Sequence, residues 1–574
     1  MLKKRGTNMR VNDISEWKKW AGSFSVEKRY DIFLAMIFAV CTVLMTRLQF
    51  SGDLWGSVSE NYVKGFGISA ILLFVILFCL FYWLIRQLDP AMCRWFGKVC
   101  LAEERKENEK KVLIFWSIVV LAAWLPYYLS YYPGGVYADT VISIKYYFSE
   151  KLSNRHPYLY NSLIGMAIQA GESLDKNLVW SMGLFTSVQM MLLEAEIIYF
   201  LHWMMKHHVK RELRTGIMIF LIFCPLIPLY GISVWKDTPF CMAVMLWSLF
   251  WIDLYLNVQK NQWNGKTLTG FVIGALLVAF TRNNGIYVIG LTALVFILMT
   301  CRQKFQRKIL TYIITLLPVF LSAWIQGPVY DWAEIDKTDA VENYGIPLQQ
   351  IGSVVAYDGN ITEEQKENLD HFIPYENIKN HFSPCLADNL KWQAGLDDDY
   401  LMENQGEFLR LWFQLLIQNP NLYVKEYLME TAGFWNVDVA TSDAYVQNFM
   451  WVTEIDKKEE HKLEQTDYFE KWFGFSFQHY VNPEYYISAA WFFWAFFVGS
   501  VFVMKHYGWK NISLFVPQLG IWLTLMAATP IAVSLRYLAA LLFTLPLILI
   551  VPVLLQRERE KDFDTGVRER ERIL

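Results

Sequence analysis

The run GISAILLFVILFCLFYWLIR occupies residues 67–86 and carries a single charge, Arg86, at its end. An α-helix of about 20 apolar residues is long enough to cross the ~30 Å hydrocarbon core of a bilayer. Similar apolar runs recur along the chain, which is 54% hydrophobic and only 19% charged. Soluble domains carry about 25% charged residues. The sequence therefore predicts an all-α polytopic membrane protein.

We predict about twelve membrane-spanning helices by this length criterion. They cover residues 31–49, 67–86, 112–130, 178–203, 214–231, 238–256, 267–281, 285–300, 309–326, 485–504, 511–531 and 536–555. Lys and Arg gather in every second connection, in segments 1–30, 87–111, 204–214, 301–308, 505–510 and at the end of the chain. Because positively charged loops stay in the cytoplasm, we predict a cell-membrane protein with both termini cytoplasmic.

The same reading divides the chain into five parts. They are a basic cytoplasmic tail (1–30), an N-terminal transmembrane catalytic module (31–326) with an outer loop at 131–177, an extracytoplasmic domain (327–484), C-terminal transmembrane helices (485–555) and a second cytoplasmic tail (556–574). Residues 327–484 are numerous enough to bury their own core, and helix-like runs at 363–371, 405–417 and 421–434 make this domain mainly helical. The run Leu159–Ala170 is too short for a span and predicts a surface or re-entrant helix.

The outer loop holds YYPGGVYADTVISIKYYFSEKLSNRHP at residues 131–157. Asp139 follows a PGG turn at a helix start, where it can act as a general base or simply stabilise the first helical turn. His156 precedes Pro157, so it can orient the acid or contact a phosphate, or only begin a helix. Tyr137 belongs to the aromatic cluster of this loop and is a candidate substrate-binding residue.

Three cations share the predicted outer face with Asp139. Lys236 in WKDTPF (235–240) can bind a phosphate as a point charge, while its neighbour Asp237 can pair with it, cap a helix or ligate a metal. Arg282 lies in TRNNG (281–285), a minimal connection between two spans, where an unpaired charge is costly. Arg536 opens the last span and can also be explained by snorkelling to the interface.

One acid and several cations at the membrane surface suit transfer of a sugar from a polyprenyl-phosphate-linked donor to an acceptor. The cations would stabilise the charge that develops on the leaving phosphate, and Asp139 would take the acceptor's proton in an inverting reaction. No second acid stands close to Asp139, so the sequence does not indicate a divalent metal ion, although it leaves one open, and we predict no other cofactor. The acidic run Asp397–Asp399 is expected to be an exposed turn.

With these residues in view, the chain resembles the GT-C superfamily of integral-membrane glycosyltransferases, and in particular a group of bacterial polytopic proteins with a YPG…D…HP outer loop. The residues that carry the resemblance are Tyr132, Pro133, Gly134, Asp139, His156, Pro157, Arg282, Asn284, Gly285, Pro347, Gln349 and Gln350. The resemblance implies a lipid-phosphate sugar donor and Asp139 as the base. The missing second acid makes the chain more similar to metal-independent monosaccharide transferases than to metal-dependent oligosaccharyltransferases.

Two other classes of function remain open. One is a transporter or flippase of a lipid-linked sugar, although the sequence shows no paired broken helices of the kind that transporters use. The other is a non-enzymatic envelope assembly protein whose outer domain is a binding module. For the enzyme, the expected partners are the lipid-linked sugar, membrane lipid and a glycan, lipid or protein acceptor of the envelope. The net charge of −3 gives no sign of a polyanionic partner, and we expect no nucleic acid.

Overall fold

The computed structural model describes residues 10–50, 61–100, 107–337, 340–439, 452–454, 462–481, 488–528, 531 and 534–573. Helices make up nearly all of the regular structure in these ranges. In the part of the chain that the structure describes, the strands form three short pairs. These are β1 (Leu48–Gln49) with β2 (Tyr62–Val63), β3 (Gly135–Val136) with β4 (Ser233–Val234), and β5 (Val452–Glu454) with β6 (Lys462–Glu464).

The first half of the chain holds the long helices and the outer-loop helices. They are α1 (Arg10–Met45), α2 (Ile68–Cys100), α3 (Glu109–Ser130), α4 (Ala138–Phe148), α5 (Tyr158–Ser173), α6 (Leu178–Lys206), α7 (Arg211–Phe223), α8 (Leu226–Ile232), α9 (Asp237–Gln259), α10 (Gly265–Thr281), α11 (Gly285–Thr300) and α12 (Lys308–Trp324). A π-helical turn, η1 (Ile325–Val329), leads from α12 into α13 (Tyr330–Trp332).

The second half begins with short helices and returns to the bundle. The short helices are α14 (Gly345–Ala356), α15 (Glu363–Phe372), α16 (Tyr375–His381), α17 (Ala387–Trp392), α18 (Asp398–Glu403), α19 (Gln405–Gln418), α20 (Pro420–Glu430), α21 (Tyr468–Phe473) and α22 (Gln478–Val481). The returning elements are α23 (Ala490–Tyr507), the 3₁₀ turn η5 (Trp509–Phe515), α24 (Val516–Ala527), the 3₁₀ turn η6 (Leu535–Leu538), α25 (Ala539–Thr544) and α26 (Leu547–Ile573).

Helices occur in all twelve predicted spans, but fewer of them are long and apolar enough to cross a membrane. Among the described residues, six qualify: Ile68–Val99, Glu109–Ser130, Leu178–Lys206, Asp237–Gln259, Lys308–Trp332 and Leu535–Glu560. A seventh is obtained if α7 and α8, bent by 51° at Pro225, count as one span. Proline breaks the helical hydrogen-bond ladder there, and α10 and α11 are apolar but shorter. The chain is thus an all-α polytopic membrane protein.

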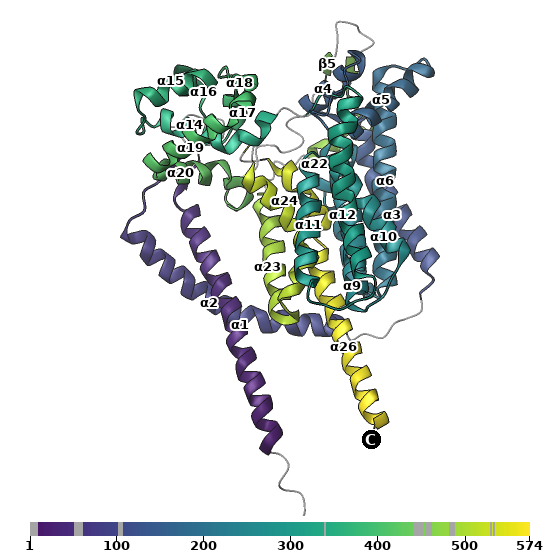
Figure 1. Cartoon of the computed structure of the whole chain (residues 1–574). Coiled ribbons are helices and arrows are strands. Elements are labelled where there is room, and N and C mark those ends of the chain that lie inside the picture. Colours follow the sequence, from purple (N-terminus) through teal and green to yellow (C-terminus); the bar gives the residue numbers. More distant parts are fainter. Residues whose placement is uncertain are drawn as a thin grey trace, which may run out of the picture.

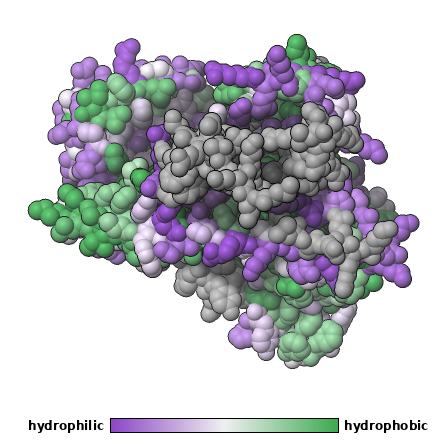
Figure 2. Space-filling model, turned by 90° about the horizontal axis from the view of Figure 1, so that it is seen from below, coloured by the Kyte–Doolittle hydropathy of each residue, from purple (hydrophilic) through white to green (hydrophobic). Residues whose placement is uncertain are grey.

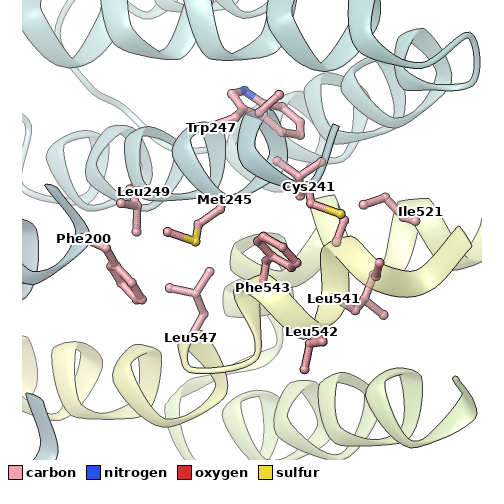
Figure 3. Packing of buried hydrophobic residues seen from close by; sticks show 14 of the residues in the cluster. Phe200, Cys241, Met245, Trp247, Leu249, Ile521, Leu541, Leu542, Phe543 and Leu547 are labelled. Carbon is pink, nitrogen blue, oxygen red and sulfur yellow. The ribbon is translucent and has the colours of Figure 1, made fainter. Parts of the chain in front are cut away.

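Helix α9 lies at the centre of the bundle. Within its most apolar stretch 78% of the residues are buried, against 6% in α2. A helix that is apolar all round packs inside a protein, whereas the apolar surface of α2 remains open to lipid. Figure 3 shows side chains from α6, α9, α24, α25 and α26 meeting in this core, among them Phe200, Met245, Ile521 and Phe543. The start of α9, with Lys236 and Asp237, is therefore held rigidly at one end of the bundle.

Helices α14 to α20 form a separate unit beside the bundle (Figure 1). Its core is a second cluster of buried residues that includes Leu348, Ile351, Val354, Phe372 and Phe408. The predicted helical runs at 363–371, 405–417 and 421–434 correspond to α15, α19 and α20 with the turn η3 (Ala432–Phe434). The acidic run Asp397–Asp399 is exposed as expected, and the Asp397 carboxylate accepts a hydrogen bond from the Tyr400 N–H at 2.9 Å, which caps α18. We call α14–α20 the outer unit.

The opposite end of the molecule carries α26 and the start of α1 (Figure 1). Figure 2 shows this face with hydrophilic residues along its upper edge and groups of hydrophobic residues at its left and lower right. Lys505 at the end of α23 contacts Asp31 of α1 at 2.6 Å and Asp89 of α2 at 3.0 Å. These ion pairs join three helices that are far apart in the sequence.

Candidate functional site

A two-residue parallel pairing places the outer loop against the start of α9. Strand β3 follows the PGG turn and strand β4 precedes Trp235, with Gly135 opposite Ser233 and Val136 opposite Val234. The Thr140 hydroxyl donates to the Val234 carbonyl, and the Gln189 amide of α6 donates to the Ser233 carbonyl at 2.7 Å. The pairing therefore brings the residues that follow each strand, Asp139 and Lys236, to the same place.

Gly134 is the residue that allows this approach. Its φ is +140°, in the region that favours glycine. A Cβ atom there would lie 2.5 Å from Thr186 Cγ2 and 2.7 Å from the Ile232 carbonyl oxygen. The Thr186 hydroxyl also donates to the Pro133 carbonyl at 2.7 Å. The PGG motif thus serves close packing of the loop on α6 and on the strand before α9.

Two cations converge on a single oxygen of Asp139. Lys236 Nζ lies 3.0 Å from Asp139 Oδ2, and Arg536 Nη1 donates to the same oxygen at 3.1 Å. The three side chains are each about one-fifth exposed. Burial alone raises the pKa of the Asp139 carboxyl, but the charges of Lys236 and Arg536 outweigh it and hold the pKa well below its usual range. Asp139 is therefore an ionised counter-ion in this structure.

His156 lies on the other oxygen of Asp139 and is neutral. Burial, together with the positive charge of Lys236, lowers the pKa of His156 to about 3. The Ser143 hydroxyl donates to the Asp139 carbonyl at 3.0 Å and lies within hydrogen-bond distance of His156 Nδ1, also at 3.0 Å. His156 Nε2 faces Asp139 Oδ1 at 3.8 Å, which is longer than a hydrogen bond. This contact is therefore not an ion pair, and Ser143 fixes the orientation of the ring.

Asp237 and Arg282 form a second charge pair next to the first. Arg282 Nη1 lies 3.0 Å from Asp237 Oδ1, and the Asp237 side chain is 1% exposed. Neither carboxylate oxygen of Asp237 accepts a hydrogen bond from the described residues, so Arg282 supplies its counter-charge without hydrogen-bond geometry. The neighbouring Asn283 and Asn284 amides donate to the Asn154 carbonyl and the Thr524 hydroxyl, which hold the 281–285 tip in place.

Aromatic rings connect the two pairs. The Arg282 and Arg536 guanidinium groups lie 4.8 and 4.9 Å from the ring centre of Tyr537. Arg536 also lies 5.3 Å from the ring of Trp235, which stacks on Tyr137 at 3.9 Å. Cation–π contacts of this kind hold a guanidinium while leaving donors available. All seven residues that we singled out from the sequence thus lie in one connected group.

The structure adds neighbours that the sequence did not reveal. The outer unit reaches the site through α17, because Leu386 bridges to Ile531 and Trp392 lies under the Arg155 guanidinium at 4.6 Å. Burial raises the pKa of the Asp388 carboxyl, although the positive charge of Arg536 acts to lower it. Trp235 and Tyr537 were also not identified from the sequence. Each stands directly beside a charged residue, but that pattern alone is too common to identify a site.

The charges around Asp139 favour an anion over a metal ion. Lys236, Arg282 and Arg536 carry three positive charges against the two of Asp139 and Asp237. Within the described part of the chain, the one group of three His, Cys, Asp or Glu side chains close enough to share a metal is Asp89, Cys93 and His506, at the other end of the molecule. Asp89 is already paired there with Lys505 and His506.

Comparison with known proteins places the chain in a family. Residues 147–564 match the model described as "Family of unknown function (DUF6020)". The match includes His156, Lys236, Arg282 and Arg536 and begins eight residues after Asp139. No curated protein and no solved structure matches the chain. Since the matched region covers well over half of its length, the chain belongs to this family.

Proposed function

We propose that the protein is a GT-C-type glycosyltransferase that moves a sugar from a polyprenyl-phosphate donor to an acceptor at the membrane surface. The observation that carries the proposal is the convergence of Lys236 and Arg536 on one oxygen of Asp139. A phosphate oxygen has the same charge and the same capacity to accept two donors. The carboxylate therefore stands in for the anion that the two cations would bind.

Donor binding would change the state of Asp139. If Lys236 and Arg536 turn to the phosphate, the carboxylate loses the two charges that depress its pKa. It then becomes a stronger base at the moment when the acceptor hydroxyl needs one. The acceptor oxygen attacks the anomeric carbon, the bond from that carbon to the phosphate oxygen breaks, and Asp139 takes the hydroxyl proton. A single displacement of this kind inverts the anomeric configuration.

The remaining residues have roles that follow from their positions. Lys236, Arg536 and Arg282 would stabilise the charge that develops on the departing phosphate. Neutral His156 would keep Asp139 oriented through the Ser143 network. Tyr137 is buried and stacks on Trp235, whose ring contacts Arg536, so this pair would help to position the Arg536 guanidinium. No step requires a metal ion.

The proposal includes a topology. The twelve proposed spans are the six long apolar helices, the broken pair α7 and α8, the short apolar helices α10 and α11, and the elements α1, α23 and η5 with α24. Both termini would be cytoplasmic, and the site and the outer unit would face outward in the cell membrane, toward an envelope glycan, lipid or protein acceptor. The basic segments identified in the sequence support this orientation.

Replacement of Asp139 tests the reaction. The purified protein in lipid nanodiscs is given a panel of polyprenyl-phosphate sugars with envelope acceptors, and release of polyprenyl phosphate is measured. We expect Asp139→Asn to lose at least about 100-fold in rate, because it removes the base. Asp175→Asn is the matched control, since Asp175 is exposed in the same loop region and should keep full activity. Full activity of Asp139→Asn contradicts the assigned role.

The same purified protein reconstituted into lipid vesicles separates the alternatives. A flippase would move a labelled lipid-linked sugar across the vesicle membrane without breaking the sugar–phosphate bond. An envelope assembly protein would do neither, and single changes at Asp139 or Lys236 would leave its partner binding intact. Either outcome replaces the glycosyltransferase proposal.

A further inference from the structure

The outer unit contains two buried carboxylates on one face of α20. Glu426 and Glu430 are one helical turn apart, so their side chains project in the same direction. Glu426 is 2% exposed and Glu430 is 0% exposed. Isolated ionised carboxylates at such depth are costly unless a positive charge or hydrogen-bond donors compensate them. These two acids have no part in the proposed reaction.

Four buried oxygen atoms around this pair accept or donate no hydrogen bond among the described residues. They are Glu426 Oε1, Glu430 Oε1, Gln349 Oε1 and Ser383 Oγ. Gln349 links the group, because its amide nitrogen donates to Glu430 Oε2 at 3.1 Å and to the Ser383 carbonyl at 2.7 Å. Gln350, the next residue, has both ends of its amide occupied by Trp412 and the Tyr423 carbonyl. The oxygen atoms without a hydrogen-bond partner therefore lie around Gln349 and not around Gln350.

Carboxyl groups outnumber cations around this group. Lys391 is fully buried, with Glu342 at 2.7 Å and Asp388 at 3.4 Å. The charges of Lys391 and Asp388 also act on Glu430, which lies beside Glu426. A bound cation would compensate these carboxyl groups when they are ionised.

We propose that Glu426, Glu430, Gln349 and Ser383 form a binding site for a hard divalent cation, with Ca²⁺ as the ion it fits. Ca²⁺ prefers carboxylate, amide and hydroxyl oxygens and accepts an irregular arrangement of them. Mg²⁺ demands a stricter octahedral geometry and keeps more of its water. Zinc prefers thiolate and imidazole ligands.

The site has a structural consequence for the candidate active site. The cation would join α14 and α20 to Ser383, three residues before the Leu386 that bridges to Ile531. The same segment continues into α17, whose Trp392 contacts Arg155 next to His156. Binding of Ca²⁺ would therefore hold the outer unit against the loop that carries Asp139. This role stands whether or not the protein transfers sugars.

Metal binding is tested on the full-length protein in detergent after chelation. Addition of Ca²⁺ should raise the melting temperature by at least about 5 °C at saturation. Tb³⁺ should show sensitised emission excited through tyrosine, because the Tyr357 ring lies close enough for Glu426 to act on it. In Glu426→Gln and in Glu430→Gln, the apparent affinities for Ca²⁺ and Tb³⁺ that these two measurements give should each fall at least about 10-fold. Glu376→Gln, an exposed acid of the same unit, is the matched control and should bind like the wild type.

Three results would overturn the proposal. The first is a melting temperature of the wild type that Ca²⁺ does not change. The second is a response of equal size in the Glu430→Gln and Glu376→Gln variants. The third is an equal response to Mg²⁺ at the same concentration, which would indicate unspecific screening. If a variant fails to fold, the Ca²⁺ titration of the wild type still decides the matter. None of these readouts depends on glycosyl transfer.

Discussion

The two charged regions of this molecule have opposite balances. Around Asp139, three cations surround two carboxylates, and the single histidine is neutral. Around Glu430, one buried lysine acts on three carboxyl groups, and a fourth, that of Glu426, lies beside Glu430. Both regions exclude much of the solvent, so neither imbalance is screened by water. The first has the chemistry to accept an anion and the second to accept a cation, and α17 lies between them.

The difference teaches what each group of residues is for. A network whose only purpose is stability pairs its buried charges closely, since an unmatched buried charge is strongly destabilising. Asp237 with Arg282 follows that rule. The surplus cations at Asp139 and the surplus acids at Glu430 do not, and we interpret each surplus as the place of a missing partner. Substitutions that remove or restore a charge in either region can therefore test this comparison of the two regions.

The largest effect is expected from unbalancing the matched pair. Arg282→Met leaves the Asp237 carboxylate, with 1% exposure, without its counter-charge. Removing one partner of a buried pair costs about 3–5 kcal/mol of folding free energy. The double variant Asp237→Asn with Arg282→Met removes both charges and should recover most of that loss. Thermal unfolding in detergent measures all three proteins, and equal losses in the single and double variants would contradict the pairing.

The two regions should respond to pH in opposite directions. Burial and the neighbouring charge raise the pKa of Glu426, and burial raises that of Glu430, above their usual value of 4.5. Folding then favours the protonated acids, so their contribution to stability is full at low pH and is lost as pH rises above 4.5. The pKa of Asp139 is depressed below 3.8, so its contribution is present above that pH and is lost on acidification.

Unfolding free energies between pH 4.5 and 7.5, in chelator, measure this difference. The wild type should lose about 1.4 kcal/mol per pH unit for each titrating acid while pH lies between the unfolded and folded pKa values. In the double variant Glu426→Gln with Glu430→Gln the slope should disappear, and bound Ca²⁺ should flatten it in the wild type. A slope that survives both changes belongs to other groups.

The sequence predicted the class of fold and the members of the candidate site, but not how they meet. Sidedness selected Asp139, Lys236, Arg282 and Arg536, because positive charge is rare on the outer face of a membrane. Their contact depends on the β3–β4 pairing, which is too short to show a strand pattern.

Other features depend on tertiary structure in the same way. Nothing in the sequence around Glu426 and Glu430 marks them as buried, and only the packing of α14 on α20 shows that they are. Fewer helices meet the length criterion than the twelve predicted spans, for a related reason. Hydropathy predicted the end of α10 at Thr281, but it does not register the bend between α7 and α8 at Pro225.

The smallest effect concerns the contact that joins the two regions. The Arg155 guanidinium lies 4.6 Å from the ring of Trp392, at the end of α17. A cation–π contact of this kind is worth roughly 0.5–2 kcal/mol, so Trp392→Ala should lower the unfolding free energy by about 1 kcal/mol. Trp392→Phe keeps an aromatic face and should restore most of it. If α17 couples the regions, Trp392→Ala should also remove the effect of Ca²⁺ on hydrogen exchange in the loop around His156. Exchange that remains Ca²⁺-dependent in this variant would show that the coupling runs through Leu386 and Ile531 instead.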